Sequence, residues 1–506
     1  MAQSTFETNP LLMTDAYKIG HQLLYPKGTQ VVYSTLTPRI NSYFPWNDKM
    51  VVFGYEAFFK KLKIMFDEGF FSRDKDEVVA EAIETISDVM GEDVAHRVTE
   101  KFEALHDLGY LPIRVRALPE GTLVPMQVPV LTIENTDPDF YWLPGYLETS
   151  LLSETFVTST VASMAREFKK VGLHYATLTS DAIEDFYTTS FLDFQFHDFS
   201  ERGQHGNEAA KLSGMAHLTS FKGTDVLQSV DHIKKVFDVD SEEVVGGSVL
   251  ATEHSVMEVL GTNQLEAYRN LIKENPNGIL SVVSDTYDYW EVVNQVLPAL
   301  KDEIMARDGK LVIRPDSLDD VGQGLVDTLN SLWSTFGGTV NSKGYRVLDS
   351  HIGLLHGEGV TLDNIDGYML KIARNGFSTE NVVFGVGAYV YSVLASRDSF
   401  GQALKATAAV VDGEEREVFK DPKTKTESFK KSLRGRVSVH GDSGNYMVFD
   451  KLNSNQVETD TENKMRVIFD PEQGVNGDVI TPLSKIRYRI SKDIVIDLIK
   501  KELEAI

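Results

Sequence analysis

The feature that most constrains the fold of this chain is a central series of short apolar runs separated by helical patterns. Amphipathic segments such as Asn263–Glu274 and Thr361–Ala373 lie between the runs. Apolar strands that alternate with helices are typical of βα units around a parallel sheet. The pattern therefore predicts an α/β fold between residues 190 and 390. The runs include Met215–Phe221, Gly246–Ser255, Ile279–Asp288, Lys310–Ser317 and Asn381–Ala388.

Polar, reactive side chains follow nearly every apolar run. One such residue is as easily explained as the cap of the next helix, but five cases in series favour another explanation. In parallel α/β folds, and in barrels above all, the carboxyl ends of the strands build the active site. The series predicts a TIM-like barrel enzyme with its site at these ends. The polar groups are His197-Asp198-Phe199, Glu253-His254-Ser255, Ser284-Asp285, Arg314-Pro315-Asp316-Ser317 and Gly357-Glu358-Gly359.

The two ends of the chain have a different pattern. Residues Tyr55–Phe71 form an aromatic-rich helical stretch, and Ile113–Asn135 alternates as antiparallel strands do, with a break at Pro119. We expect a mixed α+β N-terminal domain over residues 1–150 and a catalytic α/β barrel over 151–400. Residues 401–506 are again alternating and turn-rich, and we expect them to pack back on the N-terminal domain.

Composition excludes several classes of site. The 506 residues include no cysteine, so disulfides, thiolate metal sites and cysteine nucleophiles are ruled out. The formal net charge of -25 argues against general nucleic-acid binding, and an anionic substrate needs a local cluster of Arg, Lys and backbone N–H groups. We expect no membrane span, because no apolar run approaches the ~20 residues that one requires. The start of the chain lacks the pattern of a secretory signal, and a cytoplasmic location fits.

Ten motifs in order resemble the family of nicotinamide phosphoribosyltransferases. The resemblance runs from near residue 10 to near residue 440. It implies a type II phosphoribosyltransferase with an irregular α/β barrel, an antiparallel domain and a head-to-tail homodimer with shared active sites. The motifs are TDAYKIGH (Thr14–His21), ENTDPDFYWL (Glu134–Leu143), HDFSERG (His197–Gly203), AHLTSFKGTD (Ala216–Asp225), SVLATEHS (Ser248–Ser255), SVVSDTYD (Ser281–Asp288), IRPDS (Ile313–Ser317), NSKGY (Asn341–Tyr345), VFKDP (Val418–Pro422) and RGRVSV (Arg434–Val439).

The reaction that the resemblance implies joins nicotinamide to 5-phosphoribosyl 1-pyrophosphate. The products are nicotinamide mononucleotide and pyrophosphate, in NAD salvage. Such a displacement passes through a cation-like sugar, so the site must stabilise positive charge at the ring and negative charge on the leaving group. Mg²⁺ on the pyrophosphate is the expected cofactor.

For the base, the resemblance implies an aromatic sandwich and one selective carboxylate. Phe199 supplies one face and Tyr17 of the partner subunit the other, since flat rings are held well between aromatic faces. Asp225 accepts a hydrogen bond from the carboxamide and repels the anion nicotinate. Taken alone, Asp225 is equally a helix N-cap after Gly223-Thr224. Ser281 and Arg202 are further substrate-binding residues that the resemblance implies.

For the ribose phosphates, the resemblance implies Arg314 and Arg202 as cations, because the guanidinium fork matches phosphate. Gly385-Val386-Gly387-Ala388 resembles a glycine-rich phosphate turn in which Ala388 replaces a second glycine. Glu358 stands at a ribose position where the family usually has Asp. Arg39, Gly387, Ala388, Arg397 and Lys405 complete the implied phosphate-binding positions, with Arg397 and Lys405 reaching across the dimer.

His254 is implied to accept a phosphoryl group from ATP, whose hydrolysis is then coupled to synthesis. An imidazole nitrogen is a competent acceptor when a carboxylate holds the other nitrogen, and Asp285 and Asp316 are the candidates. Asp316 also resembles a contact to a ribose hydroxyl or to magnesium. For an isolated histidine, the competing interpretation is a buried structural residue with a satisfied N–H.

The alternatives concern both the reaction and one stretch of the chain. A nicotinate phosphoribosyltransferase, another barrel enzyme acting on sugar phosphates, and a non-catalytic binding protein of the same fold remain open. The basic stretch Lys420–Arg436 is interpreted either as a phosphate-gathering loop or as a solvated loop. Its cations are Lys420, Lys423, Lys425, Lys430, Lys431, Arg434 and Arg436.

Overall fold

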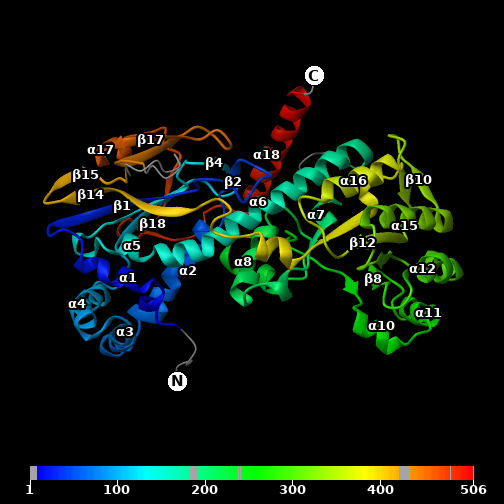
Figure 1. Cartoon of the computed structure of the whole chain (residues 1–506), viewed down its shortest axis with the longest axis horizontal. Coiled ribbons are helices and arrows are strands. Elements are labelled where there is room, and N and C mark those ends of the chain that lie inside the picture. Colours follow the sequence, from blue (N-terminus) through cyan, green and yellow to red (C-terminus); the bar gives the residue numbers. More distant parts are fainter. Residues whose placement is uncertain are drawn as a thin grey trace. The chain divides into compact units, whose positions relative to one another are not determined.

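The computed structural model describes residues 8–182, 191–237, 239, 241–420, 433–478 and 480–504. It divides into two compact units, which are described separately (Figure 1). The first unit contains Met1–Ser163, Lys234–Val239 and Ala395–Arg489. The second unit contains Met164–Ile233, Asp240–Leu394 and Ile490–Ile506.

The first unit is built on a seven-stranded sheet in the order β15-β14-β1-β5-β3-β18-β19. Every pairing in this sheet is antiparallel, and Figure 1 shows β14 beside β1. The sheet therefore joins strands from both ends of the sequence. The strands are β1 (Thr29–Thr37), β3 (Ile113–Ala117), β5 (Leu131–Asn135), β14 (Ala403–Val411), β15 (Glu414–Glu417), β18 (Arg466–Asp470) and β19 (Val475–Asn476).

Helices and two small ribbons complete the first unit. The predicted helix at Tyr55–Phe71 is confirmed as α2 (Tyr55–Phe66), which a π-helical turn (Asp67–Phe71) extends. The antiparallel strands predicted in Ile113–Asn135 are confirmed as the pair β3 and β5. The other elements are α1 (Ala16–Ile19), α3 (Lys75–Met90), α4 (Glu92–Leu108), α5 (Leu143–Tyr146), α17 (Ser454–Glu458), the ribbon β2 (Lys49–Val51) with β4 (Leu123–Pro125), and the ribbon β16 (Arg436–His440) with β17 (Met447–Leu452).

The second unit contains a six-stranded sheet in the order β6-β13-β12-β9-β8-β7, with every pairing parallel. Its inner strands are buried along almost their whole length, which is typical of a parallel sheet that is covered on both faces. The predicted mixed α/β fold with a parallel sheet is thus confirmed. The strands are β6 (Phe196–Asp198), β7 (Leu250–Ala251), β8 (Leu280–Val283), β9 (Leu311–Arg314), β12 (Ile352–His356) and β13 (Val382–Val386).

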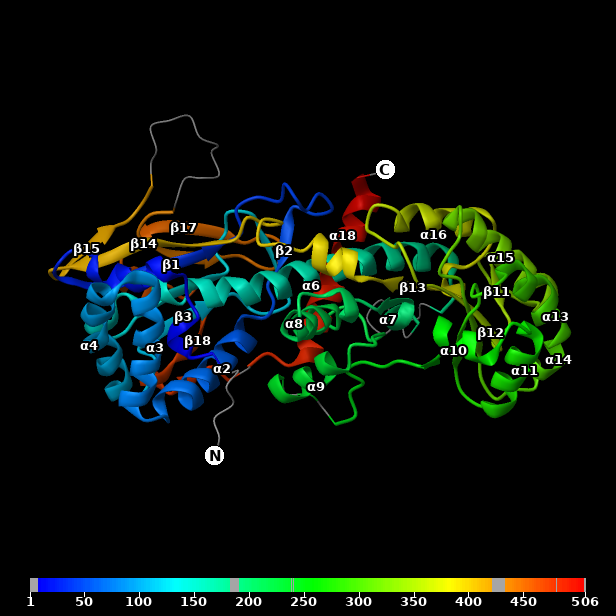
Figure 2. The same cartoon turned by 60° about the horizontal axis from the view of Figure 1, so that its bottom comes forward.

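Helices follow most of these strands, and Figure 2 shows α11 and α13–α15 on the outer side of the sheet. The helix predicted at Asn263–Glu274 is confirmed as α11. It begins at Gln264 because the Asn263 side chain caps its first turn. The helices are α7 (Leu192–Gln195), α8 (Asn207–His217), α9 (Leu227–Val236), α10 (His254–Leu260), α11 (Gln264–Glu274), α12 (Tyr289–Glu291), α13 (Leu297–Ala299), α14 (Lys301–Met305), α15 (Val321–Phe336) and α16 (Ile365–Arg374), beside a β10 (Gly338–Val340) and β11 (Arg346–Leu348) ribbon.

Two predictions from the pattern were wrong. The apolar run Met215–Phe221 is not a strand, since its first residues end α8, and periodicity alone cannot separate a short buried helix from a strand. Residues Gly223 and Thr224 instead bridge in parallel to Gly247 and Asp198. The alternating pattern of residues 401–506 is confirmed as strands as far as β19, whereas Leu483–Glu504 form a helix, α18.

Among the residues that the structure describes, two helices are longer than 18 residues, α18 and α6 (Glu148–Thr179). Within the described part of the chain, no helix is both long and apolar enough to cross a bilayer.

Candidate active site

A cavity of about 750 Å³ opens at the carboxyl ends of the parallel strands of the second unit. The residues that follow β6, β7, β9, β12 and β13 all contribute to its wall, so the structure brings together the strand ends that the sequence pattern singled out. The lining residues are Asp198, Phe199, Glu201, Arg202, Asp225, Ala251, Thr252, Glu253, His254, Val256, Arg314, Asp316, Ser317, Gly357, Glu358 and Gly387.

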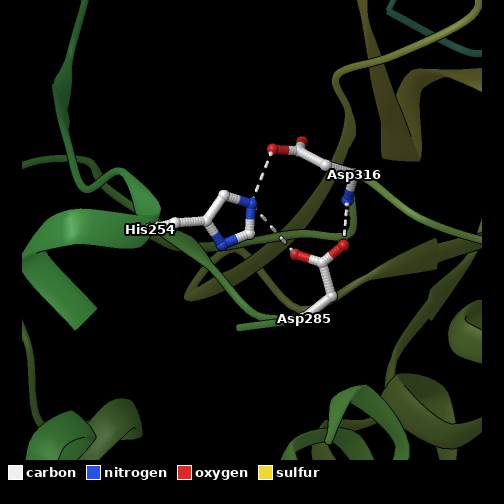
Figure 3. Close-up of side chains that lie close together, drawn as sticks. All are labelled: His254, Asp285 and Asp316. Atoms are coloured by element: carbon white, nitrogen blue, oxygen red, sulfur yellow. Dashed lines mark hydrogen bonds and ion pairs between the residues drawn. The ribbon is translucent and has the colours of Figure 1, made fainter. Parts of the chain in front are cut away.

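His254 begins helix α10 at the wall of the cavity and faces two carboxylates (Figure 3). Its Nε2 atom lies 3.8 Å from Oδ1 of Asp285 and 3.6 Å from Oδ2 of Asp316. The other ring nitrogen, Nδ1, is 3.1 Å from the hydroxyl of Thr286. The imidazole is about half exposed, whereas the Asp285 side chain is only 6% exposed. Nε2 therefore faces two carboxylates, whereas Nδ1 lies next to a hydroxyl group.

Asp285 is anchored by the backbone of the neighbouring strand end. Its Oδ2 atom accepts hydrogen bonds from the N–H groups of Asp316, at 3.0 Å, and Ser317, at 2.6 Å. Its buried Oδ1 atom forms no hydrogen bond, although His254 is close. Burial and the charges of Asp285 and Glu358 raise the pKa of Asp316, despite the attraction of Arg314 and His254. One carboxylate is thus rigidly placed, and the other takes up a proton more readily than usual.

Arg314, at the end of β9, joins this acidic group to the next strand. Its guanidinium donates to the carbonyl oxygen of Thr252 at 3.0 Å, and its Nε atom lies 3.4 Å from Oδ1 of Asp316. The side chain is 14% exposed. A guanidinium held in this way presents a fixed positive charge to the cavity.

The second group in the cavity is centred on Asp225 and Phe199. Oδ1 of Asp225 lies 3.0 Å from Nε2 of His197 and also accepts a hydrogen bond from the hydroxyl of Ser248. Burial raises the pKa of Asp225, but the hydrogen bonds from His197 and Ser248 outweigh it and leave the pKa below its usual value. The carboxylate is therefore ionised at neutral pH, with its side chain 47% exposed.

The glycine-rich turn after β13 explains how Phe199 and Ala388 are accommodated. A Cβ atom on Gly385, the fourth residue of β13, would lie 2.7 Å from the Phe199 ring, so only glycine allows the ring to occupy this place. Ala388 has an ordinary right-handed helical φ of -59°, so alanine is unstrained there. Its methyl group fills the space beside Gly203, where an added Cβ would lie 2.3 Å away.

Acidic groups dominate the charge of the cavity wall. Six of the described lining residues carry a carboxylate, whereas two, Arg202 and Arg314, carry a guanidinium. A phosphorylated ligand in such a wall needs additional positive charge. His254, Asp285 and Asp316 offer one ligand atom each, and the three atoms lie within 4.8 Å of one another. A divalent cation would fit this group, and Oδ1 of Asp285, which accepts no hydrogen bond, would be one of its oxygen ligands.

The remaining predicted residues lie elsewhere. Ser281 lies on β8, where its carbonyl oxygen accepts from Thr252 and its buried hydroxyl forms no hydrogen bond. Four others belong to the first unit: Tyr17 on α1, Arg39, Arg397 and Lys405. Tyr17 is 62% exposed, Arg39 donates to the carbonyl of Gly401, Arg397 pairs with Asp398, and Lys405 lies 3.8 Å from Glu148.

The basic stretch Lys420–Arg436 also belongs to the first unit. Lys423, Lys425, Lys430 and Lys431 lie outside the described residues. Arg434 stacks on Phe419, and Arg436 pairs with Glu134 and Glu415. These two cations are engaged in structural contacts.

Several residues of the site were given no individual role from the sequence. Thr286 follows Asp285 directly, and Glu253 precedes His254, so adjacency to a predicted residue was the available signal. His197 lies on β6 and Phe199 directly follows that strand, two positions later, where side chains of alternate residues of an extended chain share a face. That period would have placed His197 beside the ring site.

Known proteins resemble this chain over most of its length. A family model described as the nicotinate phosphoribosyltransferase family matches residues 194–472, and one for the N-terminal domain of nicotinamide phosphoribosyltransferase matches residues 9–115. The nicotinamide phosphoribosyltransferase of Acinetobacter baylyi is 39% identical over 97% of this chain and 98% of its own length. That of Xanthomonas campestris is 34% identical over 85% of this chain and 87% of its own.

A solved structure is similar in fold. The nicotinate-nucleotide pyrophosphorylase of Pyrococcus furiosus superposes with a TM-score of 0.55 at 16% identity, covering 98% of each chain. Relatives that cover most of this chain identify its family. The cavity at the ends of the parallel strands lies where enzymes of α/β fold hold their active sites. The chain belongs to the nicotinamide phosphoribosyltransferase family, and it is an enzyme of the pentosyltransferase class.

Proposed function

We propose that this enzyme transfers the ribose 5-phosphate group of 5-phosphoribosyl 1-pyrophosphate to nicotinamide, releasing pyrophosphate, in NAD salvage. The observation that carries the proposal is the ionised carboxylate of Asp225 in the cavity that Phe199 lines. Oδ1 of Asp225 already accepts two hydrogen bonds, whereas no described residue donates to Oδ2. Oδ2 is thus available to a ligand.

The charge of Asp225 supports nicotinamide as the base. A carboxylate accepts a hydrogen bond from an amide N–H but offers none to another carboxylate, and two like charges in a partly buried site repel. Nicotinate carries that second negative charge, whereas nicotinamide is neutral and donates. The flat ring of the base would lie against Phe199, with Tyr17 of the partner subunit on the other face.

The test is a comparison of nicotinamide and nicotinate at limiting concentration, in steady-state kinetics. We expect wild-type enzyme to prefer nicotinamide, and Asp225→Ala to weaken nicotinamide use and narrow the preference. Preference for nicotinate in the wild type would instead support the nicotinate-using alternative, which the name of the matching family model also admits. An unchanged ratio in Asp225→Ala would remove the assigned role of this residue.

We further propose that ATP phosphorylates His254 and that hydrolysis of the phosphohistidine is coupled to synthesis. A phosphoryl group on Nε2 would face the carboxylates of Asp285 and Asp316, whereas Nδ1 faces the neutral hydroxyl of Thr286. The Nδ1 lone pair would attack the γ-phosphorus, the bond to ADP would break, and Asp285 or Asp316 would hold the proton on Nε2. Water would then release inorganic phosphate and regenerate the imidazole.

The acidic wall supports Mg²⁺ as the cofactor, with Asp316 as the residue that would hold it. Bound Mg²⁺ would neutralise the charge of the pyrophosphate leaving group. Arg314 and Arg202 add fixed positive charge, Gly387 and Ala388 would approach the 5-phosphate, and Glu358 would meet the ribose hydroxyls.

We propose that the enzyme is a cytoplasmic homodimer with shared active sites, in which the partner subunit supplies Tyr17, Arg397 and Lys405. Arg39 would be a further residue that binds phosphate. We also propose that the parallel sheet is part of an irregular barrel. The parallel bridges Asp198 to Thr224 and Gly223 to Gly247 extend it from β6 toward the segment that leads into β7.

A further inference from the structure

We propose that His197 is a positioning residue that sets the base preference of this enzyme through Asp225. Nε2 of His197 holds Oδ1 of Asp225, which fixes the orientation of the carboxylate and leaves Oδ2 for the carboxamide of the base. The inference rests on the proposed function, because it concerns how the same site distinguishes nicotinamide from nicotinate.

The position of His197 follows from its strand. His197 and Phe199 are two residues apart at the end of β6, so their side chains share a face. The two ring centroids are 4.6 Å apart, at an interplanar angle of 36°. Phe199 lines the cavity, and the His197 side chain, 9% exposed, lies behind it against Asp225. The histidine therefore packs on the residue proposed to hold the base and bonds the one proposed to select it.

The backbone fixes the His197–Asp225 distance. The N–H of Asp198 donates to the carbonyl of Gly223, and the N–H of Asp225 donates to the carbonyl of Asp198, as neighbouring parallel strands do. A Cβ atom on Gly223 would lie 2.9 Å from Nδ1 of His197, so only glycine leaves room for the ring. The two side chains are therefore held by paired backbone segments, which makes their hydrogen bond part of a rigid structure.

Two donors on one oxygen have two consequences. They stop rotation of the carboxylate about its terminal bond, so the same oxygen always faces a ligand. They also favour the ionised form, because hydrogen bonds to a carboxylate stabilise its charge. Asp225 held in this orientation accepts a hydrogen bond from nicotinamide and repels nicotinate, whereas a rotated carboxylate would present neither oxygen in a fixed position to the base. Loss of His197 should thus weaken both effects, while the chemistry on the ribose remains.

Three substitutions separate the donor from the ring. His197→Phe keeps an aromatic ring against Phe199 and removes the donor. His197→Gln places an amide N–H near the position of Nε2, and His197→Asn is the matched control whose shorter amide reaches only the position of Nδ1. The measured quantities are kcat and KM for nicotinamide, for nicotinate and for 5-phosphoribosyl 1-pyrophosphate, with the melting temperature of each variant.

We expect His197→Phe to raise KM for nicotinamide about tenfold, the effect of losing one hydrogen bond to a charged group. The ratio of kcat/KM for nicotinamide to that for nicotinate should fall by a similar factor, with KM for 5-phosphoribosyl 1-pyrophosphate unchanged. His197→Gln should restore most of the ratio, and His197→Asn should not. In an Asp225→Ala background, His197→Phe should change the ratio no further, because the two residues act as one unit.

The outcomes separate this inference from the function on which it rests. A wild type that prefers nicotinate overturns both. A wild type that prefers nicotinamide, with His197→Phe retaining that preference, overturns the inference alone. An equal loss of activity on both bases, or a further drop of the ratio in the Asp225→Ala background, would show that His197 acts only on packing. If His197→Phe has a low melting temperature, the comparison of His197→Gln with His197→Asn decides, because both keep a polar side chain at the site. The inference requires a higher ratio of kcat/KM for nicotinamide to that for nicotinate in His197→Gln than in His197→Asn.

Discussion

The substitution Asp285→Asn isolates the charge beside His254 from the structural role of the same residue. Oδ2 of Asp285 accepts two backbone N–H groups, and the side-chain oxygen of asparagine can keep both bonds. The amide nitrogen then replaces Oδ1, 3.8 Å from Nε2 of His254. The variant loses a negative charge and a proton acceptor at that point, with the loop at residues 316–317 still held.

The size of the effect follows from the geometry. When Nδ1 attacks the phosphorus, positive charge develops on the imidazole and would draw Oδ1 of Asp285 into a charge-assisted hydrogen bond with Nε2. Such a bond contributes about 1.5–3 kcal/mol, which corresponds to a rate change of about 10- to 150-fold. Asp316, at 3.6 Å from the same nitrogen, remains in the variant and sets the effect toward the lower end. We expect ATP hydrolysis to fall by about tenfold, and by more than the rate of nucleotide synthesis measured without ATP.

The assay is ATP turnover under saturating nicotinamide, with synthesis measured in parallel with and without ATP. Asp285→Ala is the structural control, since it also removes the acceptor of the two N–H groups and should lower the melting temperature, whereas Asp285→Asn should not. Normal ATP turnover in Asp285→Asn would refute the argument that this carboxylate activates His254. An equal fall in both reactions would assign Asp285 to the sugar chemistry instead.

The remaining predictions concern His254, the shared site and His217. His254→Ala should abolish ATP turnover and leave slow synthesis, and hydrolysis at the normal rate would exclude the phosphohistidine. Mixed dimers of Tyr17→Ala and Asp225→Ala protomers should regain part of the activity that each homodimer lacks, and no recovery would count against a site built by two chains. His217 is fully buried between the hydroxyl of Tyr391 and the carbonyl of Gly223, and burial lowers its pKa to about 4. Because the unfolded chain binds this proton near pH 6.5, the stabilisation is present above that pH and is lost as pH falls toward 4. The melting temperature of wild type should thus drop more between pH 7 and pH 5 than that of His217→Gln, by the equivalent of about 2 kcal/mol, and parallel curves would contradict the assignment.

Part of the fold was predictable because it depends on local periodicity. The apolar runs at β8, β9 and β13 and the capped helix α11 carry their signal within about ten residues each. Met215–Phe221 was misassigned because a buried helix end and a buried strand look alike over seven residues. The pairing of β1 with β14 has no local signal, since the two strands come from opposite ends of the chain.

The site shows the same division. Polar residues after successive apolar runs were recognisable in the sequence, because parallel strands end at one edge of a sheet. The role of His197 was not recognisable, since it depends on Asp225, which lies in a different segment and is brought within 3.0 Å only by the bridge between residues 198 and 224.

The sequence by itself determined the secondary structure of the strongly periodic segments, the family and the candidate acids and bases, because these depend on residue identity and spacing. The tertiary structure decided which nitrogen of His254 faces carboxylates, which oxygen of Asp225 remains open and how Gly203 accommodates Ala388. These are distances between atoms of different strands, and they are fixed only when the sheet pairs and its side chains pack.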